Sequence, residues 1–144
     1  MNDLHVRAAD PSDLAAILEL FPTDSDSATR AVHHWVNSGS TRVCEQQGKL
    51  VGFAVTEATF FGHEFVEMLR VAPSARRMGA GSLLLSVISS ERATSKLFTS
   101  TNLSNTPMQT LLKGLNWSSA GIVYGLDDDD PELFYAAPRL PSFA

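Results

Sequence analysis

Residues 71–82, which read VAPSARRMGAGS, combine the residue types and spacing best suited to chemistry in this chain. Two arginines, Arg76 and Arg77, come first, and two glycines, Gly79 and Gly81, then open an apolar helix. The first N–H groups of a helix have no intrahelical acceptor, the helix dipole is positive there, and glycine lets a ligand approach closely. This pattern predicts an anion site for a phosphate or pyrophosphate, although a ligand-free tight turn has the same glycine spacing.

Two familiar phosphate loops do not fit this segment. A Walker loop ends in Gly-Lys-Ser/Thr, whereas Gly81 is followed directly by Ser82. The dinucleotide fingerprint has three spaced glycines after an early strand, and only two are present here.

The elements that position this loop follow from hydrophobic periodicity and from turn residues. Strands are predicted at residues 4–8, 41–45, 50–56, 65–71, 97–99, 122–124 and 133–135. Helices are predicted at residues 14–21, 28–36 and 82–91, and after a Ser104 cap up to Leu115. The first helix begins at Asp10-Pro11, an N-cap followed by a favoured first residue. The order indicates a mixed α+β domain with an antiparallel three-strand meander, and no linker divides residues 1–144.

Composition excludes several functional classes. The 144 residues carry 11 Lys+Arg and 16 Asp+Glu, so the net charge of −5 disfavours nucleic acid and anionic membranes as partners. Cys44 is the single cysteine, which excludes an internal disulfide and a cysteine-rich zinc site, and we expect it to be a small core residue. No signal peptide or membrane span is recognisable, so a cytoplasmic protein is expected.

Three segments together carry a family resemblance. Arg76-x-x-Gly79-x-Gly81 after Val71-x-Pro73 resembles the acyl-CoA pyrophosphate loop of the GCN5-related N-acetyltransferases (GNAT). Residues 101–105, with the apolar helix and Trp117 behind them, are similar to that family's second block, and residues 130–135 resemble the ending of small bacterial members. The resemblance implies the GNAT fold, a mostly antiparallel α+β sheet splayed between its fourth and fifth strands and flanked by four helices.

The resemblance also implies acetyl-CoA as co-substrate and no metal. In the family, the pantetheine arm pairs with main-chain groups that correspond to Leu69 and Val71. Backbone N–H groups of the loop hold the pyrophosphate; here they belong to Arg76, Arg77, Met78, Gly79, Ala80, Gly81 and Ser82. Asn102 and Asn105 are further expected cofactor contacts, with helix capping by Ser104 or Asn105 as the alternative.

Glu67 is the candidate general base. It shares a strand face with Leu69 and Val71, and a partly desolvated carboxylate there could take a proton from an ammonium group. Pairing with a basic residue across the sheet is the alternative. Many relatives place a proton-donating Tyr where this chain has Leu112; Tyr124 and Tyr135 are more readily core residues.

The implied activity is N-acetyl transfer to a primary amine of a small molecule or peptide by direct attack on the thioester. A non-catalytic acyl-CoA sensor of the same fold is the alternative, because Leu112 cannot donate a proton. Phe60, Phe61, His63 and the two early helices are expected to shape the acceptor site. The acidic run 127–130 lacks calcium-loop spacing and is expected to be a solvated loop. Dimers are frequent in such proteins, so a homodimer is compatible with the sequence.

Overall fold

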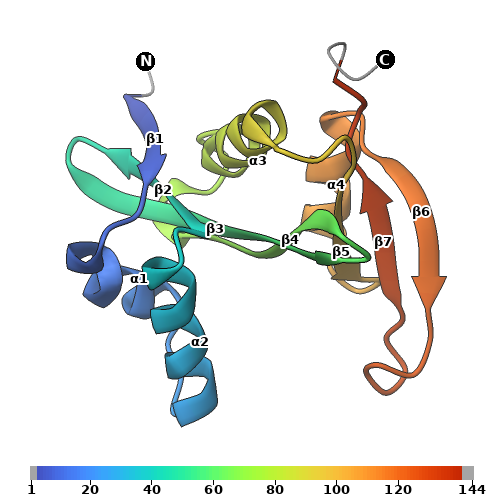
Figure 1. Ribbon diagram of the computed structural model, residues 1–144, viewed down its shortest axis with the longest axis horizontal. Coiled ribbons are helices and arrows are strands. Elements are labelled where there is room, and N and C mark those ends of the chain that lie inside the picture. Colours follow the sequence, from blue (N-terminus) through green and yellow to red (C-terminus); the bar gives the residue numbers. More distant parts are fainter. Residues whose placement is uncertain (1–2, 141–144) are drawn as a thin grey trace. The chain divides into compact units, whose positions relative to one another are not determined.

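A computed structural model describes residues 3–140 of the chain (Figure 1). The strands are β1 (Leu4–Ala8), β2 (Thr41–Gln46), β3 (Lys49–Phe60), β4 (His63–Val71), β5 (Leu97–Asn102), β6 (Ser118–Val123) and β7 (Glu132–Ala136). The helices are α1 (Leu14–Leu20), α2 (Asp26–Asn37), α3 (Ala80–Glu91) and α4 (Thr106–Gly114), with short 3₁₀ turns η1 (Pro11–Asp13) and η2 (Pro73–Ala75). The predicted α+β class and the order of elements are confirmed.

The strands form one mixed sheet of seven strands in the order β1-β2-β3-β4-β5-β7-β6. The β1–β2, β2–β3, β5–β7 and β6–β7 pairs are antiparallel, whereas β4 and β5 are parallel. The β4–β5 register covers only Glu64–Val66 against Leu97–Thr99. Both strands continue beyond these pairs, so the predicted splay between the fourth and fifth strands is confirmed.

Contacts divide the chain into two compact units. The first unit comprises the chain up to Thr56 together with Met68–Val87. The second unit comprises Glu57–Glu67 and the chain from Ile88 onward. The boundaries fall inside β3, β4 and α3, and each unit is described by itself below.

The first unit has a core on each face of its strands. Figure 1 shows α1 and α2 on one face of β1–β3 and α3 on the opposite face. The core under α1 and α2 consists of Ile17, Val32, Val36, Val43, Phe53 and Val55. On the α3 side, a Cβ at Gly52 would lie 3.4 Å from Leu84 Cδ1 and 3.0 Å from the Arg70 carbonyl oxygen. Glycine therefore allows α3 and β4 to pack close to β3 at this position.

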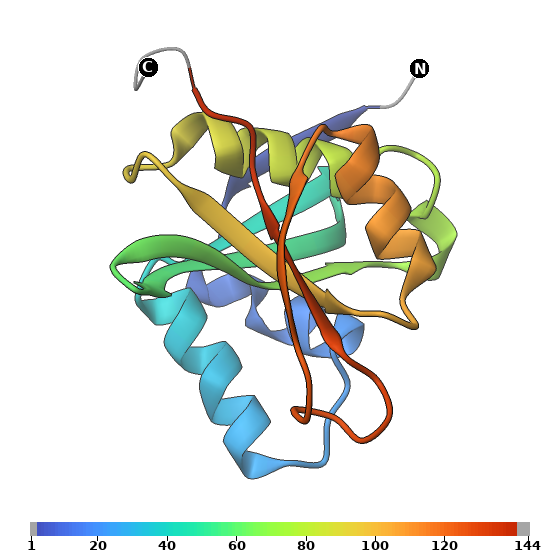
Figure 2. The same cartoon turned by 90° about the vertical axis from the view of Figure 1, so that its right-hand side faces the viewer.

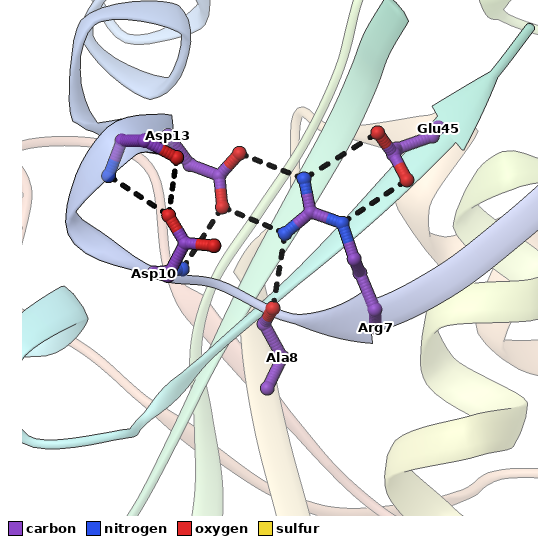
Figure 3. Close-up of polar contacts among 6 residues, drawn as sticks. Arg7, Ala8, Asp10, Asp13 and Glu45 are labelled. Carbon is purple, nitrogen blue, oxygen red and sulfur yellow. Dashed lines mark hydrogen bonds and ion pairs between the residues drawn. The ribbon is translucent and has the colours of Figure 1, made fainter. Parts of the chain in front are cut away.

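An ion-pair cluster ties β1 to the start of the first helical segment (Figure 3). Arg7 donates to both carboxylate oxygens of Asp13, at 2.7 and 2.8 Å, and its Nε donates to Glu45 Oε1 at 3.0 Å. Asp13 also accepts from the Asp10 N–H at 2.9 Å, while Asp10 accepts from the Ser12 N–H, so the predicted Asp10 cap is confirmed as a capping box. The Arg7 hydrogen bonds lower the pKa of the Asp13 carboxyl below its ordinary value.

The second unit is built on β5 and the β6–β7 hairpin, and Figure 2 shows the β6 and β7 strands running side by side. Its buried side chains include alternate strand residues, one residue of α4 and the tryptophan that follows α4: Val66, Leu97, Thr99, Thr101, Leu112, Trp117 and Tyr135. Tyr135 is therefore a core residue as expected, whereas the same expectation for Tyr124 is wrong, since Tyr124 is 74% exposed.

Three local expectations need correction. The cap of α4 is Asn105 rather than Ser104, because the Asn105 side-chain oxygen accepts the Met108 N–H at 3.2 Å. The strand β6 begins at Ser118 and ends at Val123, whereas it was expected at residues 122–124. The hairpin strands β3 and β4 extend further than predicted, so that only Phe61 and Gly62 form the turn.

Cys44 is buried, and burial raises the pKa of its thiol, as expected for a core residue. Across residues 3–140, none of the helices combines the length and apolar character needed to cross a membrane.

Candidate active site

The predicted anion loop lies in the first unit, between the end of β4 and the start of α3. The turn η2 leads into Arg76, which is extended, and Arg77 then takes a left-handed φ of 70°. Gly79 has a φ of 90°, and a Cβ built on it would meet no atom within 4 Å. Two left-handed residues thus turn the chain sharply, and the side of the loop at Gly79 is open.

The hydrogen-bond ladder of α3 begins with the Leu83 N–H, which donates to the Gly79 carbonyl at 2.9 Å. The amides of Ala80, Gly81 and Ser82 precede it, and helix geometry gives them no acceptor within α3. The Met78 N–H donates to the Ala75 carbonyl at 3.3 Å and so belongs to the turn. The loop therefore offers first-turn amides at the positive end of a helix, as an anion site requires.

The charge around the loop is positive. Residues 68–87 contain three arginines, Arg70, Arg76 and Arg77, and no Asp or Glu. Arg76 and Arg77 are exposed, so their guanidinium groups are accessible to an anion. Ala75 and Ala80 are buried and anchor the two ends of the loop. Leu69 and Val71, expected beside the pantetheine arm, are half-buried on β4 beyond the last residue paired with β5.

The second unit holds the two asparagines expected to contact the cofactor. Asn102 donates from Nδ2 to Asp127 Oδ2 at 2.8 Å and to the Asp130 carbonyl at 3.3 Å. Asn105 uses its side-chain oxygen as the α4 cap, which was the alternative interpretation. Within residues 3–140, Asn105 Nδ2 makes no hydrogen bond, so this nitrogen is available as a donor.

The acidic run 127–130 is tied to the start of α4. Asp130 accepts from both the N–H and the hydroxyl of Ser104, at 3.1 and 2.6 Å, and Asp127 accepts from Asn102. The expectation of a solvated loop is therefore wrong for Asp130, which is half-buried. It agrees with Asp127, Asp128 and Asp129, which are exposed.

Glu67 lies on β4 in the second unit. Thr59 on β3 donates its hydroxyl to Glu67 Oε1 at 2.7 Å. Glu67 is exposed, so the expected partial desolvation is not found. The partner across the sheet is a hydroxyl group rather than a basic residue, and in the described part of the chain Glu67 has no ion pair. One carboxylate oxygen remains open to water or to an amine.

Four phenylalanines from four strands of the second unit meet in one cluster. The Phe60 ring lies 5.0 Å from Phe65, 5.1 Å from Phe98 and 5.7 Å from Phe134, between centroids. Phe60 had been expected near the acceptor, but Phe65, Phe98 and Phe134 had not. Their separation along the sequence hides the cluster, which forms only through strand pairing.

Leu112 is fully buried in α4 and does not face solvent. It occupies the position at which many relatives, by the family resemblance, have a proton-donating tyrosine. A hydroxyl group there would enter the core of the second unit. Within residues 3–140, no three His, Cys, Asp or Glu side chains are grouped as metal ligands.

A strand that leaves its parallel neighbour and a loop with first-turn amides at the start of the next helix are the features that the GNAT resemblance implies. A family model described as Acetyltransferase (GNAT) family matches residues 12–117, and the chain belongs to this family. Searching curated proteins returned no match.

Solved structures agree with this assignment. An acetyltransferase of the GNAT family from Bacillus cereus ATCC 10987 is 31% identical, with a TM-score of 0.89 over 95% of this chain and 98% of that chain. Two more distant structures share the fold. The ribosomal-protein-S18-alanine N-acetyltransferase of Escherichia coli is 22% identical, with a TM-score of 0.75 and 94% of each chain covered. The diaminobutyrate acetyltransferase EctA of Paenibacillus lautus, solved with its substrate and coenzyme A, is 19% identical, with a TM-score of 0.74 and 96% of each chain covered.

Proposed function

We propose that this chain transfers an acetyl group from acetyl-CoA to a primary amine, and that the loop from Arg76 to Ser82 binds the cofactor pyrophosphate. The observation that carries the proposal is the left-handed turn at Arg77 and Gly79, which precedes the first-turn amides of α3 in an arginine-rich segment. The open space beside Gly79 fits a bulky anion at this position. The family model runs through both units, which supports one functional domain over residues 1–144.

Leu69 and Val71 are the proposed partners of the pantetheine arm. The register of β4 with β5 ends at Val66, so the following residues of β4 lack a strand partner on that side. Backbone groups without a partner can pair with the amides of an extended ligand, as in strand addition. The open Nδ2 of Asn105 is a proposed further donor, whereas the Asn102 amide nitrogen is already bonded to Asp127 and Asp130.

Glu67 is the proposed base. It would take a proton from the acceptor ammonium, directly or through water. The amine nitrogen would then form a bond to the thioester carbon as the carbon–sulfur bond breaks, and the nitrogen would lose its second proton to water. The thiolate would receive a proton from solvent, because Leu112 has none to give. A thiol has an ordinary pKa of about 8.5, so its thiolate is an acceptable leaving group near neutral pH.

Gly81→Glu and Glu67→Gln test the two halves of this proposal. A carboxylate at residue 81 would repel the phosphates, so Gly81→Glu should abolish acetyl-CoA binding measured by calorimetry. Glu67→Gln should lower kcat by about 10²-fold in an assay of released CoA with a panel of amines, while leaving the acetyl-CoA Kd unchanged. Unchanged turnover in Glu67→Gln would remove Glu67 from the mechanism.

A second function, acyl-CoA binding without transfer, is favoured by the burial of Leu112. The same two assays distinguish it. Tight acetyl-CoA binding with no CoA release on any amine would support a sensor. Release that depends on the amine concentration would support the transferase.

A further inference from the structure

The open face of the second unit combines phenyl rings with carboxylates. Ser100 pairs with Phe134 and Asn102 with Glu132 across β5 and β7, so these side chains share a face. Phe98 lies two residues before Ser100 and pairs with Phe65 on β4, which puts both rings on that face as well. The alternate residues Val66, Thr99 and Tyr135 are buried on the other face.

The rings form a continuous half-exposed surface. Phe60 and Phe134 are stacked, with an interplanar angle of 19°, and the Phe65 and Phe134 centroids are 6.1 Å apart. Each of the four phenylalanines retains partial exposure although Phe60 packs against the other three. Such a surface can cover the apolar part of a ligand, and the ring faces attract a cation.

Carboxylates border the rings on the same face. Glu132 lies two residues from Phe134 on β7 and accepts the Ser100 hydroxyl at 2.7 Å through Oε2 alone. Glu67 lies two residues from Phe65 on β4 and accepts the Thr59 hydroxyl through Oε1 alone. In residues 3–140 neither carboxylate has an ion pair, and each keeps one oxygen for a ligand.

The second unit as a whole is negatively charged, like the two carboxylates beside the rings. The second unit contains nine Asp and Glu against four Lys and Arg, whereas the first unit contains seven of each. The net charge of −5 therefore belongs entirely to the second unit. Of its four basic residues, Arg92 is buried and donates to the Pro138 carbonyl at 2.6 Å, which leaves it unavailable to the aromatic face.

We infer that the acceptor is a small primary ammonium compound with an apolar alkyl or aryl group. Its carbon skeleton lies on Phe60, Phe65, Phe98 and Phe134, and the carboxylates of Glu67 and Glu132, which border these rings on the same face, attract the ammonium group. Glu67 is also the base of the proposed function, on which this inference rests. Polar amines have no apolar surface to place on the phenyl rings, and apolar alcohols have no positive charge for the carboxylates. Both kinds of compound should therefore bind more weakly than an apolar amine.

Phenethylamine, protonated near neutral pH, is the probe. CoA release should give a kcat/KM for phenethylamine at least about tenfold above that for ethanolamine, because the apolar group adds buried surface. Calorimetry with the CoA-saturated protein should show phenethylamine binding at least about tenfold more tightly than 2-phenylethanol, its neutral counterpart.

Two variants locate the site. Glu132→Gln should raise the phenethylamine KM about tenfold with little change in kcat. Phe134→Leu keeps an apolar side chain but removes the ring, and should raise the same KM several-fold. Asp128→Asn and Tyr124→Ala are matched controls from the neighbouring loop, both exposed, and should change KM less than twofold.

Preference for ethanolamine or for a polar peptide amino terminus, equal binding of the alcohol, or an unchanged KM in both site variants would overturn the inference while leaving acetyl transfer intact. Binding of phenethylamine that depends on Glu132, without turnover of any amine, would uphold the ammonium site and remove the transferase function instead.

Discussion

Replacing Gly79 with alanine tests the contribution of the left-handed backbone of the loop, because the added methyl group would contact no neighbouring atom. Gly79 has a φ of 90°, and a Cβ at this position meets no atom within 4 Å. Alanine therefore causes no clash, and its cost is the left-handed backbone alone, roughly 1–2 kcal/mol. For a chain of this length, that loss corresponds to a fall in Tm of about 3–6 °C.

The variant can reduce this strain by rotating the peptide groups around residue 79. Such a rotation would turn the neighbouring N–H groups away from the phosphates, so acetyl-CoA affinity should fall about tenfold along with stability. Gly79→Asn should lose less stability and less acetyl-CoA affinity than Gly79→Ala, because asparagine tolerates the left-handed region better than alanine.

Gly39→Ala is the matched control. Gly39 follows α2 with a φ of 79°, and its Cβ would likewise meet no atom within 4 Å. It should lose a similar amount of stability in thermal unfolding while keeping the acetyl-CoA Kd of the unsubstituted protein. Equal loss of affinity in both variants, or undiminished affinity in Gly79→Ala, would refute the argument that the loop conformation binds the cofactor.

The remaining predictions concern stability. Asp13→Asn should cost about 2–3 kcal/mol in urea unfolding near pH 7, because Arg7 loses its two-oxygen partner. The folded pKa of Asp13 is lowered, so its ion pair stabilises the protein above the ordinary value of 3.8 and is lost as pH falls through the folded pKa. Stability should therefore fall less steeply below about pH 4 in Asp13→Asn, and an unchanged slope would contradict this. Leu112→Tyr would place a phenol at a fully buried position, so we expect overpacking that costs about 1–3 kcal/mol and no gain in turnover. A raised kcat at unchanged Tm would contradict this.

Local signals predicted the start of the first helical segment. The Asp10 cap depends only on neighbouring residues, and it forms as expected, with Asp13 completing a capping box. At α4, two adjacent residues could both cap, and the local sequence does not decide between them. Ser104 is instead held by Asp130, a contact 26 residues away, and Asn105 becomes the cap.

Features that depend on strand pairing were not predictable in the same way. All six residues of β6 are exposed, so they show no alternation, and the strand exists because it pairs with β7 through a register shift at Ser119 and Gly121. The phenyl surface has the same origin, since Phe65 and Phe98 meet by parallel pairing. The loop at residues 76–82 was predictable because its elements are contiguous.

An acidic net charge disfavours a cofactor that carries phosphates, and the distribution of charge along the chain resolves this conflict. The segment 68–87, which ends β4 and begins α3, contains three arginines and no carboxylate. The excess of carboxylates lies wholly in the second unit, with the phenyl surface. Charges separated by more than about 10 Å are screened at physiological salt, so each ligand responds mainly to the residues nearest to it. The proposed anionic cofactor and the proposed cationic acceptor are therefore each matched by the charge of the segment that would bind them, although the overall charge favours only the acceptor.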